Sequence, residues 1–130
     1  MCMKVKTESA STITLGGIVY ELTSEPSHGI VRAMRKMQKD LSFDLVRKHR
    51  DAFTAGVKVE DAMNKIFEDD PREVAAFAEM NEEFLLIGTI SVATNKLWTN
   101  DALDLCTDRE VKEAFEKCKE FLGGDVTAFL

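Results

Sequence analysis

A glycine pair between two short runs of β-branched and aromatic residues predicts a single β-hairpin at residues 12–22. Gly16-Gly17 can supply the positive φ angles of a two-residue turn, and this turn places Leu15 opposite Ile18. An isolated two-stranded hairpin is marginally stable in water. Either the chain's own helices or a partner must therefore cover its apolar face, which comprises Ile13, Leu15, Ile18, Tyr20 and Leu22.

The segment after the hairpin has helical spacing. Apolar residues recur at intervals of three and four, which places them on one face of a helix: Ile30, Met34, Met37, Leu41 and Leu45. Ser42 can cap a new helix start, because the apolar set then shifts to Val46, His49 and Phe53. One bent helix and two adjoining helices are both compatible with residues 29–53.

Start and stop signals divide the remainder into further helices. A short helix is expected around residues 59–66, and residues 70–73 then combine a cap residue, a proline and a glutamate at a new helix start. Residues 85–93 are apolar all round, which predicts a central, well-covered helix, with a strand as the alternative. Residues 107–110 form a second capping box, and the glycines at 123–124 end that helix.

These elements predict a mainly α fold, a small helical domain of four to six helices with an N-terminal β-hairpin. A chain of 130 residues is long enough for one domain with its own core. No apolar run approaches the roughly 18 residues that span a bilayer, and no signal peptide is evident, so we expect a cytoplasmic protein with no membrane contact. The expected organisation is a mobile lead-in at 1–11, the hairpin at 12–22, helices over 28–122 and a short tail at 123–130.

Residues able to carry catalysis or hold a metal are sparse. The three cysteines Cys2, Cys106 and Cys118 lack the paired spacing of a zinc site, and Cys118 falls on the apolar face of its helix. The two histidines, His28 and His49, have no nucleophile and carboxylate around them in a recognisable triad pattern. We therefore expect no enzyme activity, no metal and no cofactor.

Charge is divided unevenly along the chain. Residues 1–59 carry a net charge of +4 and residues 60–130 carry −10, which favours head-to-tail contacts between copies or docking on a charged partner. The acidic pI near 5.0 argues against nucleic acid as the partner. The basic residues gather in one segment: Arg32, Arg35, Lys36, Lys39, Arg47, Lys48 and Arg50.

The run Thr12-Ile-Thr-Leu-Gly-Gly-Ile-Val-Tyr-Glu-Leu22 resembles the start of the tail assembly chaperones of long-tailed bacteriophages. Members of that family are small and α-rich. They coat the aggregation-prone tape measure protein before the tail tube forms, and many self-associate, so the resemblance implies binding and no catalytic residues. Candidate partner-binding residues are Ile13, Leu15, Ile18, Tyr20, Arg32, Arg35, Lys36, Lys39, Phe129 and Leu130.

Three functions follow from these observations. The leading hypothesis is a non-enzymatic phage or prophage tail assembly chaperone that binds the tape measure protein in the host cytoplasm. The first alternative is a structural tail or head-tail component that forms oligomeric rings through the divided charge. The second is a small nucleic-acid-binding regulator that uses the basic segment 32–50.

Overall fold

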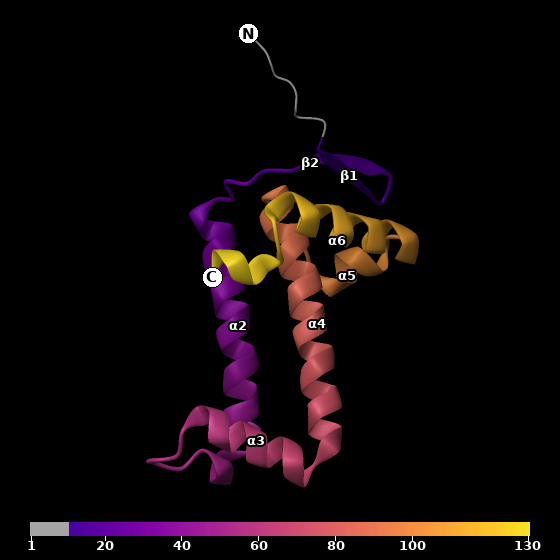
Figure 1. Cartoon of the computed structure of the whole chain (residues 1–130). Coiled ribbons are helices and arrows are strands. Elements are labelled where there is room, and N and C mark those ends of the chain that lie inside the picture. The colour runs from indigo at the N-terminus through magenta and orange to yellow at the C-terminus, as the bar shows by residue number, and fades with distance from the viewer. Residues whose placement is uncertain (1–10) are drawn as a thin grey trace. The chain divides into compact units, whose positions relative to one another are not determined.

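A computed structural model describes residues 11–130 (Figure 1). The predicted mobile lead-in at 1–11 lies outside the described residues, apart from Ser11. The described part contains two antiparallel strands and five α-helices, which confirms the mainly α fold with an N-terminal hairpin. The elements are β1 (Thr12–Leu15), β2 (Ile18–Glu21), α2 (His28–Lys48), η1 (Arg50–Ala52, a 3-10 helix), α3 (Val59–Asp69), α4 (Pro71–Thr94), α5 (Asn100–Asp104), α6 (Asp108–Leu122) and η2 (Val126–Phe129, a 3-10 helix).

The chain divides into two compact units, and the single domain over residues 1–130 stays a prediction. Unit 1 contains the described part of Met1–Met34 together with Leu85–Leu130, and unit 2 contains Arg35–Phe84. The helices α2 and α4 each contribute one part to unit 1 and one part to unit 2.

The hairpin of unit 1 has the predicted turn and register. Gly16 and Gly17 have φ angles of 61° and 80°, the left-handed values that a two-residue turn needs. Leu15 lies opposite Ile18 next to the turn, as expected, and the antiparallel pairing continues to Thr12 and Glu21.

The chain's own elements cover most of the hairpin's apolar face. Helix α6 packs against β1, so Ile13 and Leu15 are only 2% and 1% exposed. The ring of Tyr20 meets Trp98 edge-on, with 5.3 Å between the ring centroids. Ile18 is 57% exposed because α6 contacts β1 and β2 is the outer strand, so for this residue the alternative of a covering partner stays open.

The last turns of α4 form the core of unit 1. Residues 87–93 are buried and helical, so the alternative of a strand is excluded. Two buried hydroxyls in this stretch are satisfied. Thr89 accepts a hydrogen bond from the backbone N–H of Val126 at 3.0 Å, and Ser91 accepts one from the backbone N–H of Trp98, also at 3.0 Å.

The C-terminal residues pack into this core, where we predicted a short tail. Val126 in η2 is completely buried. A Cβ atom built on Gly88 of α4 would lie 2.9 Å from Val126 Cγ1 and 3.3 Å from the sulfur of Met34. The glycine therefore makes room for η2 to lie against α4.

Helix α6 begins and ends as the sequence predicts. Thr107 accepts a hydrogen bond from the backbone N–H of Glu110, and the Glu110 carboxylate accepts one from the backbone N–H of Thr107, which completes the capping box. Gly123 has a left-handed φ of 75° and caps the other end. Cys118 lies on the buried face, as expected, and burial raises the pKa of its thiol to about 12.

Unit 2 is an antiparallel helix pair closed at one end by α3 (Figure 1). Helix α2 is continuous to Lys48, and η1 follows it as a separate short turn. Ser42 caps no new start, because its hydroxyl donates to the carbonyl oxygen of Gln38 inside α2 at 3.4 Å. Of the two alternatives for residues 29–53, the structure shows one α-helix, which ends at Lys48.

The core of unit 2 is small. Among residues 35–84, four side chains are buried: Leu45, Ala62, Ile66 and Phe84. Phe67 of α3 packs on Phe77 of α4 at 5.7 Å between centroids. Val74, in the first turn of α4, is 45% exposed. Much of the apolar surface of this unit therefore faces solvent.

Candidate protein-interaction surfaces

The structure separates the predicted partner-binding residues into buried and accessible ones. Ile13 and Leu15 belong to the core of unit 1, so the partner contact predicted for them is not available in this structure. Tyr20, Phe129 and Leu130 are half-buried. This leaves Ile18 as the exposed apolar residue of the predicted hairpin surface.

The four predicted basic residues are all exposed on α2. Arg32 lies in unit 1, whereas Arg35, Lys36 and Lys39 lie in unit 2. Lys36 and Lys39 form no ion pair with any residue of 11–130.

Two large apolar side chains share the face of these lysines. Phe43 is 60% exposed and Val46 is 37% exposed, beside a shallow depression that Lys39 also lines. The four residues Lys36, Lys39, Phe43 and Val46 follow one another at intervals of three, four and three, and we call them the α2 outer face. Phe43 lies two residues from Leu41 and two from Leu45, which belong to the apolar face of the helix. Two residues correspond to about 200° around the helix axis, so Phe43 lies on the opposite side.

Sequence reasoning did not single out Phe43 or its role. The signal was present, because a phenylalanine two positions from each neighbouring member of an apolar stripe points away from the core. The prediction of a basic surface on that side of the helix includes the lysines and arginines but omits the phenylalanine between them.

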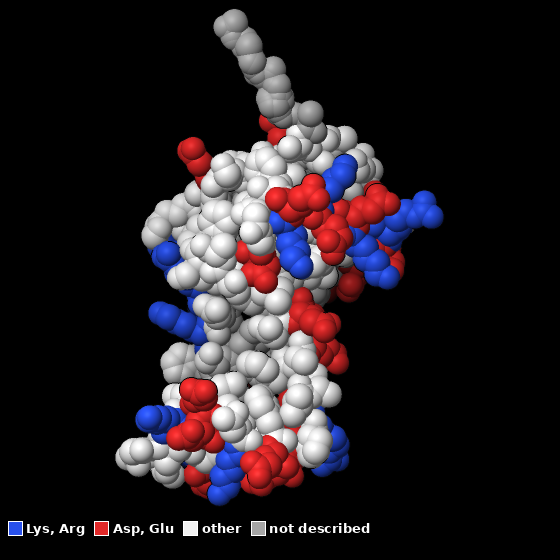
Figure 2. All heavy atoms as spheres, viewed as in Figure 1, with Lys and Arg blue, Asp and Glu red and all other residues white. Residues whose placement is uncertain are grey.

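The first half of α4 carries the opposite charge on its outward side. Arg72, Ala75, Glu79 and Glu82 are exposed at intervals of three, four and three, and we call them the α4 outer face. The last three lie two residues from Phe77 or Phe84, which mark the inward side. Along the two helices of unit 2, Figure 2 shows basic side chains on the side of α2 and acidic ones on the side of α4, with mixed charges around α3.

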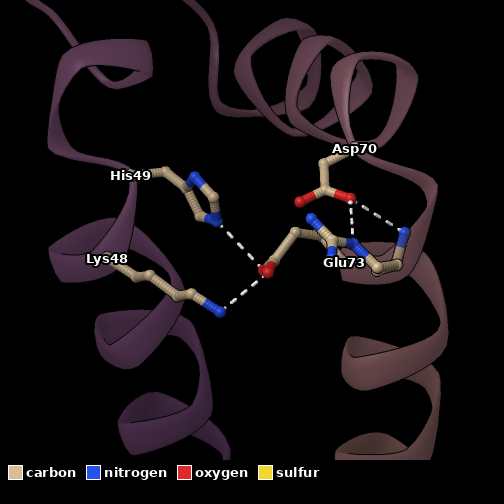
Figure 3. Close-up of polar contacts among 5 residues, drawn as sticks. Lys48, His49, Asp70 and Glu73 are labelled. Carbon is tan, nitrogen blue, oxygen red and sulfur yellow. Dashed lines mark hydrogen bonds and ion pairs between the residues drawn. The ribbon is translucent and has the colours of Figure 1, made fainter.

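One polar cluster ties the end of α2 to the start of α4 (Figure 3). The Glu73 carboxylate accepts from Lys48 Nζ at 2.7 Å and contacts His49 Nε2 at 3.0 Å, and its side chain is 12% exposed. These two hydrogen bonds, the one from Lys48 first, hold the pKa of Glu73 below its ordinary value.

The same cluster corrects one detail of the predicted helix start. Asp70 caps α4 as expected, accepting from the backbone N–H of Arg72 at 3.1 Å. Glu73 does not complete a capping box, because its carboxylate turns to Lys48 and His49 instead. The cluster therefore connects the end of α2 to the start of α4, and its polar groups are hydrogen-bonded to one another.

A hollow of about 490 Å³ lies beside this cluster, between η1 and α3. Charged side chains of both signs line it, including Lys48, Lys65, Asp51 and Asp69. This mixed lining favours neither an anionic nor a cationic ligand. Across residues 11–130, no group of three His, Cys, Asp or Glu side chains is placed to hold a metal ion.

Searches against protein-family models, curated proteins and solved structures found no match to this chain. Within the described residues, no helix has both the length and the apolar character needed to cross a membrane.

Proposed function

We propose that this protein is a non-enzymatic protein-binding factor of the tail assembly chaperone type. It uses the α2 outer face to hold an amphipathic, acidic helical segment of a client protein. The client we propose is the tape measure protein. The observation that carries the proposal is the exposure of Phe43 and Val46 on a helix face whose other members are lysines.

The chemistry of this face supports a helical client. Apolar side chains at helical spacing bind the apolar stripe of a partner helix, and the flanking lysines favour acidic residues beside that stripe. Phe43 supplies the largest apolar contact, and aromatic side chains commonly anchor such interfaces.

The construction of unit 2 also supports binding. Four buried side chains among residues 35–84 are few for a helical unit, and six large apolar side chains are exposed there: Phe43, Val46, Val57, Val59, Val74 and Met80. Scattered exposed apolar residues are ordinary on a protein surface. Phe43 and Val46 are adjacent on one helix face, and this adjacency makes the α2 outer face the preferred contact.

Co-expression with the tape measure protein tests the proposal, with the soluble fraction of the tape measure protein as the readout. Wild type is expected to raise that fraction, and the Phe43→Ser/Val46→Ser variant is expected to lose most of the effect. Leu105→Ser is the matched control, because Leu105 is 88% exposed in unit 1 and its loss removes a similar apolar group elsewhere.

Two results would contradict the proposal. The first is a tape measure protein that is equally soluble with and without this chain. The second is a salt-dependent titration of duplex DNA that Lys36→Glu/Lys39→Glu abolishes, which would support the nucleic-acid-binding regulator instead.

A further inference from the structure

We infer that a second copy of this chain binds the α2 outer face with its α4 outer face, so that copies add side by side in one direction. This inference rests on the proposed function in one respect: it takes the α2 outer face to be a protein-binding surface. The second copy and the client's helical segment would occupy the same surface, so each excludes the other from it.

The two faces have the same spacing when α4 is read backwards. Along α2 the residues Lys36, Lys39, Phe43 and Val46 are separated by three, four and three positions. Along α4, in reverse order, Glu82, Glu79, Ala75 and Arg72 are separated by three, four and three positions. An antiparallel pair of these helices therefore aligns every member of one face with a member of the other.

The aligned residues are complementary in charge. Lys36 meets Glu82, and Lys39 meets Glu79. Since these four side chains are exposed and form no ion pair within residues 11–130, they are available for contacts with another molecule. Charge pairs of this kind set register and orientation and exclude like-charged alternatives.

The aligned residues are also complementary in size. Phe43, the bulkiest member of the α2 outer face, meets Ala75, and two more small residues, Ala76 and Ala78, lie close to that position on α4. Small side chains allow a partner helix to approach closely, so the phenylalanine has room to pack. Val46 meets Arg72, whose side chain is 92% exposed and can lay its aliphatic stem over an apolar neighbour.

The geometry of unit 2 determines how such contacts continue. The two outer faces lie on the sides of α2 and α4 that point away from their shared core, so one molecule cannot pair them with each other. Helices α2 and α4 run antiparallel within unit 2, and the intermolecular pair is antiparallel as well, so neighbouring copies have the same orientation (Figure 1). Contacts between two different faces form an open row, or a ring if the rotation closes.

Charge exchange tests the pairing with the full chain. Sedimentation velocity of wild type at low salt is expected to show species larger than a dimer that grow with concentration and shrink as salt is raised. Lys36→Glu/Lys39→Glu and Glu79→Lys/Glu82→Lys are each expected to weaken association about tenfold or more, since each turns two attractive contacts into repulsive ones. An equimolar mixture of the two variants is expected to associate again, because every contact in it pairs opposite charges.

The matched control is Lys117→Glu, a charge reversal at an exposed position of α6 in unit 1, which is expected to leave association unchanged. A wild type that stays monomeric, a closed dimer with no larger species, or a mixture no more associated than its components would overturn the inference. Those results are distinguishable from a failure of the proposed function, which is read from the solubility of the tape measure protein. Association without client rescue would leave the pairing standing and remove the chaperone role.

Discussion

The contact between Gly88 and Val126 predicts that two destabilising substitutions will compensate each other. In Gly88→Ala the new Cβ lies 2.9 Å and 3.2 Å from the two methyl carbons of Val126, closer than packed carbons normally approach. Val126→Ala removes both of those methyl groups. The double variant therefore relieves the close approach to Val126 and fills part of the cavity that the truncation of Val126 leaves. The approach to the Met34 sulfur at 3.3 Å remains, and a small shift of that flexible side chain accommodates it.

The magnitudes follow from the burial of both sites. Overpacking costs about 1–3 kcal/mol, and replacing a helical glycine by alanine returns about 1 kcal/mol, so Gly88→Ala is expected to lose about 1 kcal/mol of unfolding free energy. Val126→Ala removes two fully buried methyl groups and leaves a cavity, which costs about 2 kcal/mol. The double variant keeps the gain in helix propensity without the clash, so we expect a loss of about 1 kcal/mol, which corresponds to a favourable coupling of about 2 kcal/mol.

Thermal unfolding followed by tryptophan fluorescence measures this cycle. Trp98 is the single tryptophan of the chain and is 5% exposed in unit 1, so its signal reports on the unit that contains both sites. At about 4 °C per kcal/mol for a chain of this size, Val126→Ala is expected to lower the Tm by about 8 °C and the double variant by about 4 °C. A double variant that is no more stable than Val126→Ala alone would refute the packing of η2 against α4.

Three further predictions concern single groups. Because hydrogen bonds from Lys48 and His49 lower the pKa of Glu73, its contribution to stability is present above the ordinary carboxyl pKa of 4.5 and is lost as the pH falls toward the lowered value. Circular dichroism should therefore show Glu73→Gln less stable than wild type at pH 7, with the difference shrinking below pH 4.5. Thr107→Ala should cost about 1 kcal/mol in urea unfolding, with Thr107→Ser close to wild type. Iodoacetamide at pH 8 should alkylate Cys118 only in denaturant, as peptide mass spectrometry can check, because burial raises the pKa of this thiol to about 12.

The features that the sequence predicted correctly are those that local chemistry determines. The hairpin register follows from a turn that only glycines adopt easily, and the capping box at Thr107 and the cap at Gly123 each involve residues within one turn of a helix. The burial of Cys118 follows from its place in a stripe of apolar residues at helical spacing. None of these features requires knowledge of which helices are neighbours.

The features that the sequence did not predict depend on contacts between distant segments. The burial of Val126 requires η2 to meet Gly88, 38 positions earlier in the chain. Glu73 follows a helix start that predicts a capping box, but its carboxylate binds Lys48 and His49, which lie 25 and 24 positions earlier in the chain. The exposure of Ile18 depends on which of the two strands α6 covers. Neither helix propensity nor hydrophobic periodicity predicts these contacts, because both depend only on residues that are close together in the sequence.

The difference between the two units connects packing to the proposed role. In unit 1, buried side chains from β1, α4, α6 and η2 meet in one core, and the hydroxyls of Thr89 and Ser91 within it are hydrogen-bonded. In unit 2, four buried side chains hold residues 35–84, and the ion pair between Lys48 and Glu73 adds a connection at the surface. A partner helix that covers Phe43 and Val46 would add apolar burial to the unit that has fewer buried side chains. Because a ligand stabilises the folded state to which it binds, occupation of the α2 outer face should stabilise unit 2 more than unit 1, whichever helix supplies the contact.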